Sequence, residues 1–288
     1  MLKLARRSFI PFVTAGHPDL ESTERIVLAL AQTGANVIEV GIPFSDPVAD
    51  GPTIQLSSFK ALAHGYGISD YIQMIERVRS KTDVGLIFMT YLNPVLSYGL
   101  EKLDREAAAA GLDGILISDL TPEEYLGGRS SANLEGLHSQ NASPEPASVE
   151  ASWSIGSEIP GPFDAFTFKR LKTVFLVAPT STEDRLKRIC DASTAFIYLV
   201  ARTGVTGKQT QLDRSLPALV GKIRKYSDLP VAVGFGIRSK SDVEQVWRFA
   251  EGAVVGSAIV DFIERNRECT DLAGKVVDFV NDSLLPIR

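Results

Sequence analysis

The sequence predicts an α/β fold, a single (β/α)8 TIM barrel in which eight parallel strands alternate with helices. Eight short apolar runs recur along the 288 residues, most of them bounded by Gly, Pro or Asp. They lack strict polar alternation, which is typical of strands covered on both faces in a parallel sheet. Stretches with helical periodicity lie between most of these runs, always in the order strand then helix.

The expected strands are residues 9–14, 37–41, 86–91, 114–118, 174–178, 195–200, 231–234 and 253–256. The expected helices are residues 21–33, 71–79, 100–110, 183–192, 212–226 and 239–250. Ser239 with Asp242 resembles a capping box at the start of the last of these helices. A doubly wound open sheet is the structural alternative, but the loop after the first strand, 15–20, lacks the G-x-G-x-x-G pattern.

One segment, 127–165, interrupts the alternation where the helix after the fourth strand is expected. It has 39 residues, of which 17 are Gly, Ser or Pro, so it buries little apolar surface against the entropy of ordering. We expect a low-complexity, flexible insertion in place of the fourth helix; a functional lid is the alternative. Without it the chain has roughly the 250 residues of one barrel, so residues 1–288 are expected to form one domain.

Composition narrows the class of protein. Hydrophobic residues make up 44% and charged residues 23% of the chain, and the formal net charge is −5. These values exclude a largely disordered, collagen-like or coiled-coil chain, and a broad basic surface for nucleic acid or membranes is not expected. Cys190 and Cys269 are predicted to act as small apolar residues. The three histidines are predicted to be loop or surface residues, because they lack metal-ligand spacing: His17, His64 and His138. The chain is expected to be soluble and cytoplasmic, or in the plastid stroma if the source is a photosynthetic eukaryote.

The most informative residues for chemistry are two carboxylates near the second strand. Glu39 lies within the apolar run 37–41, where a carboxylate is rarely buried without a function or a partner. Burial would raise its pKa into a range useful for proton transfer near neutral pH. Asp50 lies on the following loop, at the end of the barrel where active sites are built. The alternatives are a Glu39 that faces a polar barrel mouth or pairs with a cation, and an ordinary turn aspartate at position 50.

Three glycine-rich turns follow the last three strands, at 202–207, 234–237 and 256–258. Glycine allows backbone N–H groups to approach an anion closely, and a helix N-terminus adds a favourable dipole. Barrels of this class commonly bind phosphate after strands seven and eight, so we expect a phosphate site here.

The motifs together resemble the tryptophan synthase alpha subunit. The resemblance rests on I-E-V-G-I-P-F-S-D-P-V-A-D-G-P at 38–52, R-T-G-V-T-G at 202–207, G-F-G-I at 234–237 and G-S-A-I-V at 256–260. P-F-V-T-A-G at 11–16 and Y-L-N-P at 91–94 fit as well. The match covers about 9–124 and 173–264, which is most of the chain.

This resemblance implies retro-aldol cleavage of indole-3-glycerol phosphate to indole and glyceraldehyde 3-phosphate, without a metal or organic cofactor. It implies a pyridoxal-phosphate beta subunit as partner in a heterotetramer that receives the indole. Glu39 matches the general acid/base, Asp50 the carboxylate that binds the indole N–H, and Tyr198 a tyrosine near the glutamate. The positions that match substrate and phosphate contacts are Phe12, Met89, Thr206 and Phe235 for the substrate, and Gly207, Gly236, Gly256 and Ser257 for the phosphate.

Three departures from the family pattern stand out: a short segment before residue 9, His17 where aspartate is commoner, and the segment 127–165. Three alternatives to the two-protein synthase remain at this point. They are a stand-alone lyase with the same chemistry, a catalytically weak barrel that binds or activates a partner, and another phosphate-sugar enzyme such as an isomerase or epimerase.

Overall fold

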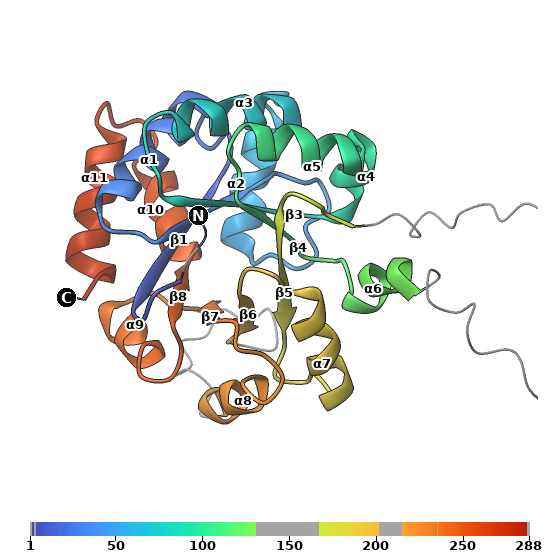
Figure 1. Ribbon diagram of the computed structural model, residues 1–288. Helices are drawn as coiled ribbons and strands as arrows, with labels where there is room; N and C mark the ends of the chain where they lie inside the picture. Colours follow the sequence, from blue (N-terminus) through green and yellow to red (C-terminus); the bar gives the residue numbers. More distant parts are fainter. Residues whose placement is uncertain (1, 3, 131–166, 202–214, 235, 287–288) are drawn as a thin grey trace, which may run out of the picture.

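The eight strands form a closed parallel barrel in chain order, as the sequence predicts (Figure 1). The computed structural model describes residues 2, 4–130, 167–201, 215–234 and 236–286. Each strand overlaps its predicted run, with shifts of at most two residues at either end. The strands are β1 Ser8–Thr14, β2 Val37–Gly41, β3 Gly85–Thr90, β4 Gly114–Ile117, β5 Lys172–Val177, β6 Ile197–Val200, β7 Val231–Gly234 and β8 Gly252–Val255.

Each strand contributes to two separate apolar clusters, because successive side chains point to opposite faces of a sheet. In β1, Ile10 and Phe12 belong to the cluster inside the barrel, whereas Phe9 and Val13 belong to the cluster between the barrel and its helices. In β2 the alternation places Glu39 on the inward face with Val37. Both faces are therefore covered, which explains why the strand sequences are apolar throughout.

Helices surround the barrel (Figure 1). They are α1 Leu20–Gln32, α2 Pro52–Leu62, α3 Ile68–Arg79, α4 Leu92–Tyr98, α5 Leu100–Ala109, α6 Pro122–Ser130, α7 Glu183–Ala192, α8 Leu216–Ile223, α9 Lys240–Val246, α10 Ser257–Arg265 and α11 Leu272–Phe279, followed by a π-helical turn at Val280–Leu284. The capping box of Ser239 and Asp242 is confirmed at α9. Of these helices, α2, α4, α6, α10 and α11 were not expected from the sequence. Within the described part of the chain, no helix is long and apolar enough to cross a membrane.

The segment expected to replace the fourth helix begins later than predicted. Residues 127–130 belong to α6, and the rest of the segment lies outside the described residues. The helix has a reciprocal cap at its start: Glu124 N–H donates to Thr121 Oγ1 at 3.2 Å, and Thr121 N–H donates to Glu124 Oε2 at 3.0 Å. Such a cap stabilises the first turn, so the helix extends into the Gly127–Gly128 pair that the composition alone assigned to the insertion.

Pairing of the first and last strands closes the barrel. Ser8, Phe9 and Ile10 of β1 lie in register with Gly252, Ala253 and Val254 of β8. The buried indole N–H of Trp247, which follows α9, donates to the Ser8 carbonyl at 2.9 Å. The N-terminal segment also contributes, since Leu2 is buried in the cluster inside the barrel.

A buried carboxylate positions the chain where it enters β5. Asp104 of α5 is 3% exposed and accepts the backbone N–H groups of Lys169, Arg170 and Leu171 at 2.9–3.2 Å. Carboxylates that accept several backbone N–H groups form strong, charge-assisted hydrogen bonds. Asp104 therefore fixes the start of β5 against α5.

We expect Asp104→Ala to lower the free energy of unfolding by about 2–4 kcal/mol, because the mutation leaves several backbone donors without their acceptor. Glu101→Ala, an exposed change on the same helix, serves as the control and should cost less than about 0.5 kcal/mol. Urea unfolding of both variants measures the difference. Equal stability of the two variants would contradict this assignment.

Candidate functional site

One pocket at the carboxyl ends of the strands gathers the predicted site residues that the structure describes. It has a cavity volume of about 100 Å³ and is open to solvent. Eight of the eleven residues singled out from the sequence line it: Phe12, Glu39, Asp50, Met89, Tyr198, Gly236, Gly256 and Ser257. The other three, Thr206, Gly207 and Phe235, lie outside the described residues.

Three further residues line the pocket and were not singled out from the sequence. Gly51 and Ile54 belong to the start of α2, and Val254 faces inward from β8. Ile54 and Val254 enlarge the apolar wall beside Phe12. The signal for Ile54 was its place just after the Asp50 loop, but the helix α2 that turns it inward was not expected.

Glu39 occupies the centre of the polar part of the pocket. It lies on β2 in register with Phe12 of β1 and Ile87 of β3, and it is 1% exposed. Burial, with a smaller contribution from the charge of Asp50, raises the pKa of Glu39 to about 8. Its Oε1 atom has no hydrogen-bond partner among the described residues. At neutral pH Glu39 is therefore predominantly a protonated acid with one oxygen available to a ligand.

Asp50 lies in a different environment on the loop between β2 and α2. The loop is held by Asp50 N–H donating to Pro47 O at 3.0 Å and by the Gln55 amide donating to Asp50 O at 2.9 Å. The Tyr91 hydroxyl, just after β3, accepts the Ala49 N–H at 3.1 Å and hydrogen bonds to the Asp50 carboxylate.

Burial raises the pKa of Asp50 to about 6, and the Tyr91 hydrogen bond counteracts part of that shift. Asp50 is therefore mainly ionised at pH 7, when Glu39 is mainly protonated. Two carboxyl groups of one pocket thus differ in protonation state because their surroundings differ. Tyr91 is a functional candidate that sequence reasoning missed; its signal was a hydroxyl-bearing residue at the end of the third strand.

Close backbone approaches make room for the two aromatic side chains of the pocket. A Cβ atom on Gly41 would lie 2.4 Å from the Phe12 ring, and a Cβ atom on Gly234 would lie 2.1 Å from the Tyr198 hydroxyl. Only glycine fits at either position. The Tyr198 side chain is buried, and burial together with the charges of Glu39 and Asp50 raises the pKa of its hydroxyl well above the ordinary value.

Three more lining residues come from chain segments that can present backbone N–H groups to a ligand. Gly256 is the N-cap of α10, Ser257 is its first residue, and Gly236 follows β7. The first N–H groups of a helix have no carbonyl partner within the helix, and they favour an anion at its N-terminus. Among the described residues, no group of three or more His, Cys, Asp or Glu side chains is placed to hold a metal ion.

Comparison with known proteins gives one consistent result. A sequence model described as the tryptophan synthase alpha chain matches residues 2–141 and 163–281. The tryptophan synthase alpha chain of Geobacter sulfurreducens is 38% identical over 277 residues, covering 96% of this chain and 92% of that protein. That of Thermoanaerobacter pseudethanolicus is 35% identical and covers 96% of this chain and 92% of that protein.

Solved structures agree. A mutant tryptophan synthase alpha-subunit from Pyrococcus furiosus superimposes with a TM-score of 0.76 at 31% identity, covering 97% of this chain and 98% of that one. A chain of the tryptophan synthase complex from the same organism gives a TM-score of 0.74 at 32% identity, with coverage of 97% and 100%.

The buried acid makes stability depend on pH. Because the folded pKa of Glu39 lies above its unfolded value, the folded state holds the proton more tightly, and stability falls as pH rises from about 4.5 to about 8. Glu39→Gln removes this loss, so at pH 8.5 the variant should unfold at a temperature roughly 5 °C higher than the wild type. At pH 4.5 the two should nearly coincide. Calorimetry across this range measures the difference, and a gain of the same size at both pH values would contradict the assignment.

Proposed function

The chain belongs to the tryptophan synthase alpha chain family, and we propose that Glu39 is the acid–base catalyst of its reaction and Asp50 the anion that stabilises the indole ring, in the pocket described above. The enzyme is a lyase of tryptophan biosynthesis. It cleaves indole-3-glycerol phosphate to indole and glyceraldehyde 3-phosphate, and the indole passes to a beta subunit.

Glu39 is the general acid and then the general base. Breaking the bond between indole C3 and the glycerol chain requires a proton on C3 and removal of the proton from the adjacent hydroxyl. Protonated Glu39 donates to C3, and the resulting carboxylate takes the hydroxyl proton as the carbon–carbon bond breaks, so the aldehyde forms and Glu39 returns to its acid form. A pKa of about 8 supports this role, because the group is mostly an acid at neutral pH yet a competent base once ionised.

Asp50 is the anionic partner of the indole ring. When C3 is protonated, positive charge develops on the ring and its N–H, and a carboxylate at that place stabilises it. Its pKa of about 6 keeps Asp50 ionised at neutral pH, and the Tyr91 hydroxyl helps to maintain that charge. Tyr198 packs beside Glu39 and completes the polar part of the pocket.

The two ends of the substrate bind to chemically different walls. Phe12, Met89 and Ile54 form apolar surface for the indole, and Phe235 and Thr206 add to this part of the site by their sequence match. Gly236, Gly256 and Ser257, with Gly207, supply backbone N–H groups for the phosphate.

The single observation that carries this assignment is Glu39: a buried, protonated carboxyl group on the inward face of β2, with one unpartnered oxygen, in the same pocket as an ionised Asp50. An isomerase or epimerase acting on a phosphorylated sugar does not need this pair. A barrel that only binds or activates a partner gains nothing from keeping a desolvated acid in it.

The proposal also covers cellular location and domain organisation. A cytoplasmic location is supported by the bacterial relatives, whereas nothing observed favours a plastid. The closed barrel formed by the described strands supports one domain for the whole chain.

We expect Glu39→Gln to reduce indole release by at least about 10³-fold, since glutamine neither donates a proton to carbon nor accepts one from the hydroxyl. The binding of an inert analogue, in which indole and phosphate are joined by a three-carbon chain, should change by no more than about threefold because shape and polarity are retained. Indole release is measured by absorbance with saturating substrate, and analogue binding by calorimetry. Turnover near the wild-type value would exclude Glu39 as the acid.

We expect Tyr91→Phe to shift the acid limb of the pH profile toward higher pH. Loss of the hydroxyl removes a hydrogen bond that lowers the pKa of Asp50, so Asp50 takes up its proton at higher pH than in the wild type. At pH 6 the value of kcat/KM should fall roughly threefold to tenfold relative to the wild type, with a smaller loss at pH 8. Profiles from pH 5 to 9 measure the shift. A uniform loss at all pH values would indicate that Tyr91 acts only by packing.

A further inference from the structure

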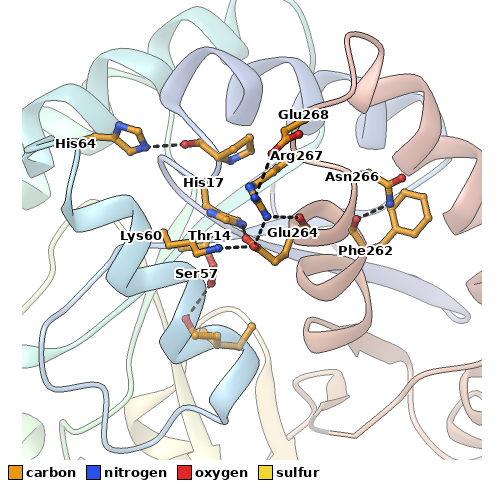
Figure 2. A network of polar contacts seen from close by, with 12 residues as sticks. Thr14, His17, Ser57, Lys60, His64, Phe262, Glu264, Asn266, Arg267 and Glu268 are labelled. Atoms are coloured by element: carbon orange, nitrogen blue, oxygen red, sulfur yellow. Dashed lines mark hydrogen bonds and ion pairs between the residues drawn. The ribbon is translucent and has the colours of Figure 1, made fainter.

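A cluster of charged side chains joins two helices near their C-terminal ends, whereas the N-terminal ends of the same helices line the pocket. It consists of His17 from the loop after β1, Lys60 of α2, Glu264 of α10 and Arg267 just beyond α10; Figure 2 shows these side chains converging on Glu264. None of the four lines the pocket. His17, expected as a loop or surface residue, is in a loop but 3% exposed.

Glu264 accepts its hydrogen bonds through Oε1, whereas Oε2 lies near His17 without a hydrogen bond among the described residues. Lys60 pairs with Oε1, the Arg267 guanidinium lies 2.8 Å from the same oxygen, and His17 Nε2 lies 3.1 Å from Oε2. A neighbouring contact also joins these elements: the hydroxyls of Thr14 at the end of β1 and Ser57 in α2 lie 2.7 Å apart (Figure 2). Glu264 thus connects α10 to both α2 and the loop after β1.

The electrostatics keep Glu264 charged. Burial pushes the pKa of Glu264 upward, but the hydrogen bond from Lys60 and the charges of Lys60, His17 and Arg267 outweigh it, so the pKa lies below its ordinary value. Burial lowers the pKa of His17; the charge of Glu264 opposes this, while Lys60, Arg267 and His64 reinforce it. The centre of the cluster is therefore one carboxylate held by two permanent cations, with a neutral histidine beside it.

The two joined helices carry different parts of the pocket lining. The start of α2 follows Asp50 directly and contributes Gly51 and Ile54, whereas the start of α10 contributes Gly256 and Ser257. At 1.5 Å per residue, Lys60 lies about 12 Å along α2 from Pro52. Glu264 lies about 10 Å along α10 from Ser257. The helices α2 and α10 pack on one another and on β1. The Lys60–Glu264 ion pair near their C-terminal ends therefore constrains the distance between their first turns.

We propose that Glu264 is a positioning residue that sets the distance between the Asp50 end of the pocket and its phosphate end. This rests on the proposed function, which assigns the indole to the first end and the phosphate to the second. Each end is built locally, so it binds its own part of the substrate without Glu264. A substrate that spans both ends depends on their spacing, and Glu264 fixes that spacing from outside the pocket.

Separate and joined ligands distinguish positioning from a general structural role. Three probes are used with the full chain: indole, glycerol 3-phosphate, and the inert analogue that joins indole to phosphate through three carbons. In Glu264→Gln the joined analogue should bind about tenfold more weakly and kcat/KM should fall about tenfold, since misplacement of a reacting group costs one to two orders of magnitude. Indole and glycerol 3-phosphate should each bind within about twofold of the wild type.

The chain offers a closely matched control. Glu24 of α1 also joins two helices, accepting from Arg77 of α3 at 2.7 Å and from Lys81 at 2.9 Å. Its side chain is 13% exposed, against 19% for Glu264, and neither α1 nor α3 lines the pocket. Glu24→Gln removes the same charge from the same kind of link and should leave all three affinities and kcat/KM unchanged. Lys60→Met cuts the link from its more exposed side and should reproduce Glu264→Gln even if that variant folds poorly.

Each outcome decides the question. A selective loss for the joined analogue in Glu264→Gln and Lys60→Met, absent in Glu24→Gln, supports the positioning role. Parallel loss for all three probes together with a lower unfolding temperature, or no difference from Glu24→Gln, overturns it. Failure of the wild type to bind the joined analogue would refute the proposed function itself, and the positioning role with it.

Discussion

Closing eight parallel strands into a barrel removes the carboxyl of Glu39 from water, and most of what this molecule does depends on that desolvation. The side chain is 1% exposed and one oxygen has no partner within the described residues, so the neutral acid is the favoured form. A stability cost is accepted in return for a group that can give and take a proton near pH 7. The same residue on an outward-facing position of β2 would be packed among helices instead of facing a ligand.

The other residues of the pocket keep Glu39 away from water and bring no positive charge near it among the described residues. Gly41 and Gly234 allow the Phe12 ring and the Tyr198 hydroxyl to approach the strands, so aromatic surface, not water, surrounds the acid. No cation lines the pocket among the described residues, and the nearest charge is a second carboxylate, Asp50. Because Asp50 is on a loop and hydrogen bonded to Tyr91, it ionises at lower pH than Glu39. One carboxyl on a strand and one on a loop therefore differ in protonation state at neutral pH because their surroundings differ.

Charged groups outside the pocket have a different task, since they are paired and fix the position of elements. Asp104 holds the chain at the start of β5 through backbone N–H groups. Glu264 links α10 to α2 and to the loop after β1 (Figure 2). Glu264 and Glu39 show the contrast: cations beside Glu264 lower its pKa and keep it ionised, whereas burial without a cation raises the pKa of Glu39 and makes it an acid.

Local patterns in the sequence predicted the strands of this protein, several helices and eight of the residues that line the pocket. Apolar runs predicted all eight strands to within two residues, and a carboxylate within one such run identified Glu39. Two features required tertiary structure. One is the protonation state of Glu39 and Asp50, because burial and the Tyr91 contact arise only when β1, β2 and β3 are assembled. The other is the link through Glu264, whose partner Lys60 lies 204 residues away along the chain. Hydrophobic periodicity reports which face of an element is buried, but it carries no information on which distant charge that element will meet.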